Sequence, residues 1–260
     1  MTSTNAWRVL SSGESDGVVL ACDFPTPARP EASLTEFVTH LTPAPTLWES
    51  AMPRAGAEAG WRAEDYLEWW LAPVRESGVR VSGVLGFCAG SVFASAVAAA
   101  VGDVPLVVID PELPTSVALY AQYHRGVEVF GAALPKSDVD EMLAEGQQLL
   151  TRDDDVQVYG PALSELYLRV GDIALAKIGL NPARRAELGA TFTSFVSWVV
   201  AAGQLDPTEQ WARAVCVSSN DHAAQPIDVR ERITVDVDHN GMLRHPEVAR
   251  AVVEALAVRH

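Results

Sequence analysis

Short apolar runs alternate with helical patterns at both ends of the chain, and this alternation narrows the possible folds more than any other feature. Apolar, β-branched segments predict strands over residues 17–24, 45–50, 79–87, 104–110, 212–219 and 232–238. Helical spacing of apolar residues predicts helices over 33–41, 62–78, 89–102 and 246–258. Strands that alternate with helices indicate a mostly parallel central sheet flanked by helices on both faces.

The strand signal disappears between residues 115 and 207, where the pattern is helical. We predict helices over 137–150, 161–179 and 181–203, the last starting with Asn181 as N-cap and Pro182 in the first turn. This block separates two stretches of α/β pattern. The sequence therefore predicts a single domain whose core, residues 1–114 and 208–260, is interrupted by a helical lid insertion over residues 115–207.

The segment GFCAG, residues 86–90, joins a predicted strand directly to a predicted helix. This G-x-C-x-G pattern has the layout of a nucleophile elbow, in which the glycines allow a sharp turn and the central side chain projects from the sheet. Cys88 would then be a nucleophile, and the N–H of Ala89 would hold an oxyanion. The helix N-terminus is expected to favour the thiolate and lower the pKa of Cys88. The alternative is that these small residues only permit tight packing.

A thiolate nucleophile needs a base, and the base needs an acid to orient it. His239 follows the last predicted strand, and Asp110 ends the strand after the elbow, so both are expected at the sheet edge where Cys88 lies. Asp221 is the competing acid, whereas Asp238 should point away from its neighbour His239. His245, which precedes Pro246, is interpreted as a helix-entry residue. The remaining histidines are interpreted as surface or packing residues: His40, His124, His222 and His260.

Three segments, GFCAGS, LVVIDPELP and VDHNGMLRHPEVARAVVEAL, together resemble the thioesterase branch of the α/β-hydrolase superfamily. The resemblance implies an α/β-hydrolase fold with a helical lid and a catalytic triad of Cys88, Asp110 and His239. The segment DFPTPARP has the family's Phe-Pro at the first oxyanion loop, but Pro27 lacks an N–H. Thr26 is therefore the expected second oxyanion donor, beside Ala89.

Members of this branch usually carry serine at the elbow, whereas this chain carries Cys88. Transfer onto a cysteine exchanges one thioester for another, and a thioester favours carbon or nitrogen nucleophiles over water more than an oxygen ester does. The chain is similar in this respect to the stand-alone Dieckmann cyclases that release tetramic acids and pyridones from polyketide and nonribosomal peptide assembly lines. That resemblance implies a β-ketoacyl-aminoacyl substrate on the phosphopantetheine arm of an acyl or peptidyl carrier protein.

Three other functions stay open at this point. The first is a hydrolytic thioesterase that clears stalled chains. Cys88 is the one sequence feature that favours a cyclase over this function. A small-molecule esterase would suit a lid but seldom uses cysteine. A catalytically inactive hydrolase fold that acts as a binding protein would have no reason to keep an elbow, an acid and a histidine in order.

Composition excludes several partners. The net charge is −15 with only two lysines and no basic tract, so we expect neither nucleic acid nor an anionic membrane surface as a partner. The apolar runs are shorter than the roughly 20 residues of a membrane span. The chain begins without a signal-peptide pattern and has three cysteines without metal-ligand spacing, which predicts a cytoplasmic protein with free thiols.

The predicted chemistry requires only a nucleophile, a base and oxyanion donors, so we expect no metal and no cofactor. We predict Phe87, beside the nucleophile, and Trp198, in the insertion, as substrate contacts. Trp198 and the other aromatic side chains of the insertion either line an apolar acyl channel or pack the helices together.

Overall fold

The computed structural model describes residues 5–13, 17–24, 31–53, 56–58, 60–222 and 227–257. These residues form two compact units. Unit 1 comprises residues 1–52, 64–113 and 205–260, and unit 2 comprises residues 53–63 and 114–204. None of the described helices is both long and apolar enough to cross a membrane.

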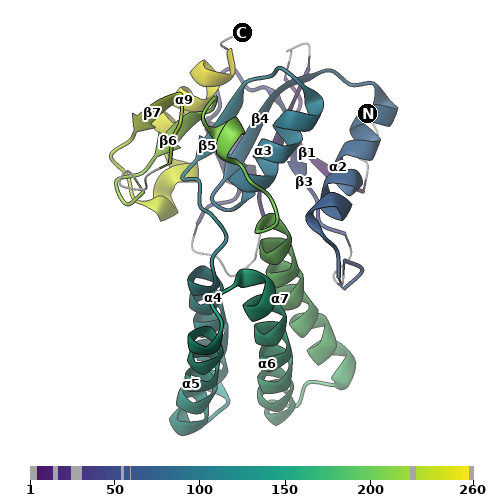
Figure 1. The fold of residues 1–260 in the computed structure, drawn as a ribbon, viewed down its shortest axis with the longest axis vertical. Coiled ribbons are helices and arrows are strands. Elements are labelled where there is room, and N and C mark those ends of the chain that lie inside the picture. The colour runs from purple at the N-terminus through teal and green to yellow at the C-terminus, as the bar shows by residue number, and fades with distance from the viewer. Residues whose placement is uncertain are drawn as a thin grey trace. The chain divides into compact units, whose positions relative to one another are not determined.

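A seven-stranded sheet forms the centre of unit 1 (Figure 1). Its order is β1-β3-β2-β4-β5-β6-β7; β1 pairs antiparallel with β3, and every other pairing is parallel. The strands are β1 (Trp7–Ser11), β2 (Val18–Cys22), β3 (Thr46–Ser50), β4 (Val81–Phe87), β5 (Leu106–Ile109), β6 (Val215–Ser218) and β7 (Glu231–Thr234). The prediction of a mostly parallel sheet flanked by helices is confirmed.

Six of these strands lie within the segments predicted from the sequence or overlap them, and β1 is an addition. It is an edge strand in which the exposed Arg8 interrupts the apolar pattern, and the Arg8 guanidinium pairs with Glu49 of β3. The last strand is shorter than predicted, because its pairing with β6 ends at Thr234. The chain then runs through a loop to the 3-10 helix η3 (His239–Arg244).

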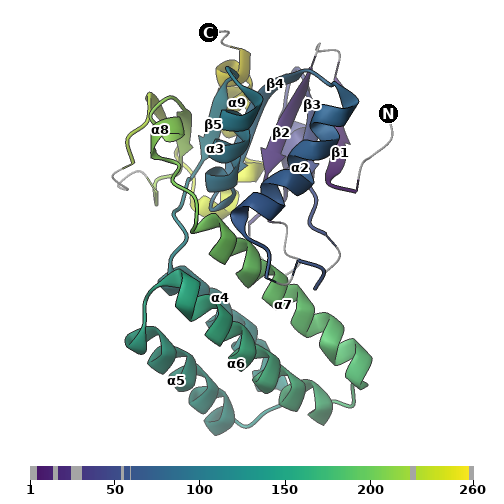
Figure 2. The same cartoon turned by 45° about the vertical axis from the view of Figure 1, so that its right-hand side comes forward.

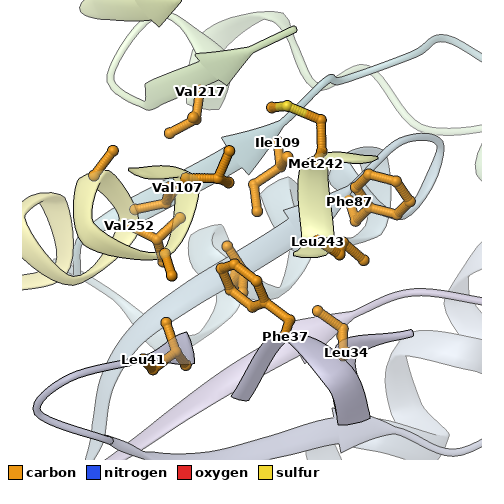
Figure 3. Packing of buried hydrophobic residues seen from close by; sticks show 14 of the residues in the cluster. Leu34, Phe37, Leu41, Phe87, Val107, Ile109, Val217, Met242, Leu243 and Val252 are labelled. Carbon is orange, nitrogen blue, oxygen red and sulfur yellow. The ribbon is translucent and has the colours of Figure 1, made fainter. Parts of the chain in front are cut away.

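Helices cover both faces of the sheet. On one face α1 (Leu34–Phe37), the 3-10 helix η1 (Val38–His40), η3 and α9 (Pro246–Ala257) pack their apolar side chains on alternate strand residues (Figure 3). On the other face α3 (Gly90–Val101) packs on β4, and α2 (Ala63–Ser77) packs on α3 through Tyr66, Trp70 and Phe93. The short helix α8 (Thr208–Trp211) also packs against α3. The central strands are thus buried from both sides, which explains their continuous apolar runs.

Unit 2 is helical. It contains α4 (Ser116–Val129), the 3-10 helix η2 (Phe130–Ala132), α5 (Lys136–Arg152), α6 (Val156–Lys177) and α7 (Pro182–Ala202), with α6 packed against α4, α5 and α7 (Figure 2). The cap of α7 is as predicted, since Asn181 accepts a hydrogen bond from the N–H of Arg184. The predicted start of α6 at Pro161 is wrong, because Asp155 caps the helix by accepting from the Gln157 N–H. Helix α4 was not among the predicted helices.

Candidate active site

Cys88 lies at a sharp turn between β4 and α3. Its φ angle is +51°, in the left-handed region that non-glycine residues rarely adopt. Its N–H donates to the carbonyl oxygen of Ile109 in β5 (2.9 Å), and its carbonyl oxygen accepts from the N–H of Ser91 in α3 (3.0 Å). These bonds hold a strained conformation in place, as is common at functional sites. The side chain is partly buried and lies at the carboxyl edge of the sheet.

The two glycines of the elbow are required by close approach of neighbouring segments. A Cβ on Gly86 would lie 2.5 Å from the Cα of Ser91 and 2.7 Å from the Cβ of Ala94. A Cβ on Gly90 would overlap the carbonyl oxygen of Cys22, at the end of β2. The absence of both side chains lets α3 start directly against the sheet.

Gly90→Ala is therefore expected to destabilise the protein by about 1–3 kcal/mol, because backbone must move to make room for the methyl group. Urea unfolding measures this loss. Gly131→Ala is the matched control, since an added Cβ there meets nothing closer than 4.0 Å. Equal unfolding midpoints for the two variants would contradict this account of the elbow.

Asp110 and His239 form a hydrogen-bonded pair at the same edge of the sheet. Asp110 follows β5, is fully buried and has a φ angle of +42°. Its Oδ2 lies 2.8 Å from Nδ1 of His239, and its Oδ1 accepts from the N–H of Ser219 (2.7 Å). Burial works to raise the pKa of Asp110, but the hydrogen bonds from His239 and Ser219 outweigh it and hold the pKa below its ordinary value. The pair thus consists of an ionised acid and an oriented imidazole.

The position of His239 is fixed by packing as well as by Asp110. Met242 and Leu243, both fully buried, anchor η3 in the core near Phe87 (Figure 3). The Phe87 ring stacks on the His239 imidazole with 5.2 Å between centroids and 10° between planes. Since Phe87 is itself only 2 % exposed, its visible role is to support the imidazole, and substrate contact by Phe87 stays a prediction.

Asp221, the competing acid, contacts His239 differently. Its Oδ2 accepts from the backbone N–H of His239 (3.2 Å), and the imidazole Nδ1 is bonded to Asp110 instead. Asp238 caps η3 by accepting from the Gly241 N–H (2.7 Å). Of these three carboxylates, Asp110 is the one placed to orient the ring.

Two further residues of the site were missed from the sequence. His222, which was interpreted as a surface or packing residue, stacks on His239 with 4.6 Å between ring centroids. Its Nε2 lies 2.6 Å from Oε1 of Glu112, and its Nδ1 lies 3.7 Å from Oδ2 of Asp110. Glu112 in turn accepts a hydrogen bond from the Cys88 thiol, with 3.3 Å between Sγ and Oε2. Glu112 follows the carboxyl end of β5, and His222 follows that of β6. This position after a parallel strand was the sequence signal that could have identified them as site residues.

The protonation of Cys88 differs from the sequence-based expectation. Burial and the Glu112 carboxylate raise the pKa of the Cys88 thiol well above its ordinary value, and the Ala89 N–H lowers it by less. The lowered pKa that the helix N-terminus predicts for Cys88 is therefore wrong for this structure, in which the neighbouring groups favour the protonated thiol. Within the described part of the chain, no hydrogen bond joins Cys88 Sγ to His239.

The remaining predicted site residues are placed as follows. The Ala89 N–H is close enough to the Cys88 sulfur to favour a negative charge there. Thr26, predicted as second oxyanion donor, lies outside the described residues. Trp198 belongs to α7 of unit 2 and is buried, and its contact with substrate stays a prediction.

Asp110, His222 and His239 each bring one possible ligand atom within 4.8 Å of the others, so these side chains could together hold a metal ion. However, Asp110 Oδ2 and His239 Nδ1 are hydrogen-bonded to one another, and a metal ion would have to replace that bond.

Comparison with solved structures identifies the fold. The chain is similar to a four-domain nonribosomal peptide synthetase, with TM-score 0.59 and 14% identity over 97% of this chain, although it spans only 20% of that chain. It is also similar to the Vlm2 thioesterase domain, with TM-score 0.52 and 16% identity over 97% of this chain and 98% of that one. The enol-lactonase from Burkholderia xenovorans LB400 gives TM-score 0.54 and 13% identity over 97% and 96% of the two chains.

No protein-family model matches the sequence, and the search of curated proteins gives no match. The solved structures with which this chain aligns along most of its length include a thioesterase domain, a lactonase and a haloalkane dehalogenase. The expected fold class is thus confirmed: this chain has an α/β-hydrolase fold.

Proposed function

We propose that this protein is a chain-releasing acyl-transfer enzyme of the thioesterase kind. It takes a β-ketoacyl-aminoacyl thioester from a carrier protein onto Cys88 and closes it by Dieckmann condensation to a tetramic acid or pyridone. The single observation that carries the proposal is the elbow cysteine, Cys88, at a positive-φ turn beside the hydrogen-bonded Asp110–His239 pair. The similarity in fold to a thioesterase domain supports thioester chemistry.

Acylation begins when the sulfur of Cys88 attacks the thioester carbonyl of the substrate. The thiol proton passes to Nε2 of His239, whose Nδ1–H is held by Asp110. Catalytic hydrogen bonds are often long before substrate binds, so an unmade Cys88–His239 bond in the free protein agrees with this step. The Ala89 N–H holds the tetrahedral oxyanion. When the intermediate collapses, the phosphopantetheine thiolate leaves and takes the proton back from His239.

Ring closure uses the same base a second time. Neutral His239 removes the acidic proton from the carbon between the ketone and the amide, and the resulting carbanion attacks the carbonyl of the Cys88 thioester. The carbon–sulfur bond breaks, the ring is released, and His239 returns the proton to the Cys88 thiolate. The net change is one carbon–carbon bond formed and one carrier thiol freed, with no metal or cofactor involved.

Sulfur is what favours cyclisation over hydrolysis in this proposal. The acyl group on Cys88 remains an activated thioester, which a carbanion attacks more readily than water does. The competing function is a hydrolytic thioesterase, in which His239 activates water against the same acyl-enzyme. The same three side chains serve both reactions, and the products distinguish them.

The proposal is tested by identifying the product that the protein forms from a synthetic β-ketoamide pantetheine thioester. We expect a tetramate from the native protein, and we expect Cys88→Ser to yield a larger share of linear acid, because its oxygen ester is less activated. Liquid chromatography with mass detection separates the two products. Linear acid as the sole product of the native protein would overturn cyclisation and favour the hydrolytic thioesterase.

A further inference from the structure

A second acid–histidine pair, Glu112 and His222, lies beside Cys88 and has no role in the steps above. Glu112 uses both carboxylate oxygens: Oε2 accepts from the Cys88 thiol (3.3 Å), and Oε1 is 2.6 Å from Nε2 of His222. His222 is mostly buried, and Glu112 is half-buried. The nucleophile is thus hydrogen-bonded to an acid that does not belong to the Asp110–His239 pair.

His222 holds Glu112 in its charged form. The hydrogen bond from His222 outweighs burial and lowers the pKa of Glu112, while Glu112 in return raises the pKa of His222. The second nitrogen of His222, Nδ1, faces Oδ2 of Asp110 at 3.7 Å. An imidazolium between two carboxylates is stabilised by both, so the negative charge on Glu112 persists at neutral pH.

Most of the groups around Cys88 raise the pKa of its thiol. Burial, the Glu112 carboxylate and Asp23, which follows β2, all disfavour a thiolate, and the Ala89 N–H is the opposing contact. His239 and Asp110 are bonded to each other, and His222 is bonded to Glu112. A carboxylate that accepts from a thiol stabilises the protonated sulfur and repels the ionised one.

We propose that Glu112, fixed by His222, is a positioning residue that keeps Cys88 as a neutral thiol until substrate engages His239. This inference rests on the proposed function, in which Cys88 is the nucleophile, and adds a residue that regulates the protonation of its thiol. Thiolates rather than thiols react with alkylating agents and oxidants. A resting thiol would therefore protect Cys88 from unproductive reactions while the acylation step remains open to it.

The test measures the rate at which iodoacetamide alkylates Cys88 between pH 6 and pH 10, with peptide mapping to assign the modified residue. In the native protein we expect slow alkylation that still rises at pH 9. In Glu112→Gln the loss of charge is expected to lower the pKa of Cys88 and to accelerate alkylation at pH 8 about tenfold or more, because a larger fraction of the sulfur is then thiolate.

Two variants separate this electrostatic role from a merely structural one. Glu112→Asp keeps the charge and is expected to remain slow, whereas damage to the local fold would affect both substitutions alike. Glu247→Gln, an exposed carboxylate on α9, removes the same net charge elsewhere and is expected to leave the profile unchanged. A native Cys88 that is already a thiolate at pH 8, or equal profiles for the native protein and Glu112→Gln, would overturn the inference.

This assay needs no acyl substrate, so it can fail or succeed independently of the proposed function. A shifted alkylation profile in Glu112→Gln together with an absence of acyl-enzyme in the native protein would support the role of Glu112 in keeping Cys88 protonated and would reject acyl transfer. An unshifted profile together with acyl-enzyme would do the reverse.

Discussion

Cys88→Ala is expected to form no acyl-enzyme and to lose turnover of a pantetheine thioester by about 10⁴-fold or more. The substitution removes the sulfur and leaves the Cβ, so the backbone at φ +51° is no more strained than before. Turnover is measured by release of the pantetheine thiol, and circular dichroism checks that the variant is folded.

Cys22→Ala and Cys216→Ala are the matched controls for this loss. Both native side chains are fully buried within strands, Cys22 in β2 and Cys216 in β6, and neither lies at the elbow turn, so neither is placed to attack a substrate. We expect each folded control variant to retain turnover. Activity that survives in Cys88→Ala but disappears in either control would show that the nucleophile lies elsewhere.

Asp110→Asn is expected to lower kcat by about 10³–10⁴-fold, because an amide neither stabilises an imidazolium nor selects the tautomer with a proton on Nδ1 of His239. Asparagine is isosteric and tolerates the φ of +42° at this position, so the fold should survive. The measurement is steady-state turnover with a pantetheine thioester.

Asp221→Asn is the control, since Asp221 accepts a hydrogen bond from the backbone N–H of His239 and not from its imidazole ring. We expect it to reduce kcat by less than about tenfold. A loss as large as that of Asp110→Asn would mean that the wrong carboxylate has been assigned to the imidazole.

The central sheet was predictable because its strands are buried on both faces and therefore read as continuous apolar runs, as in β5 and β6. The edge strand β1 was not predictable in this way, because Arg8 and Val9 are exposed and its pairing with β3 depends on tertiary contacts such as Arg8 with Glu49. Helix α4 was not predicted either: its buried Leu119, Tyr123 and Val127 recur at helical spacing, but exposed apolar residues such as Val117 and Val129 blur that pattern.

The Asp110–His239 contact could be anticipated because parallel strands end at one edge of the sheet: Asp110 directly follows β5, and His239 follows β7 after a short loop. Glu112 and His222 could not be singled out in the same way. Asp110 adopts a positive φ, and the next turn brings the Glu112 N–H to the carbonyl oxygen of Cys88 (3.3 Å). This turn places a carboxylate against the thiol, and sequence position alone does not specify it. The error about the Cys88 thiolate has the same origin, since the helix N-terminus was weighed without the neighbouring charge.

Acyl transfer to Cys88 is tested most directly by intact-mass measurement and peptide mapping of the native protein after exposure to a simple acyl-pantetheine thioester. Such a substrate lacks the acidic carbon, so its acyl group cannot leave by cyclisation. We predict a mass increase of one acyl group, located on the peptide that contains Cys88. An acyl group on another residue, or thiol release with no acyl-enzyme at short reaction times, would contradict it.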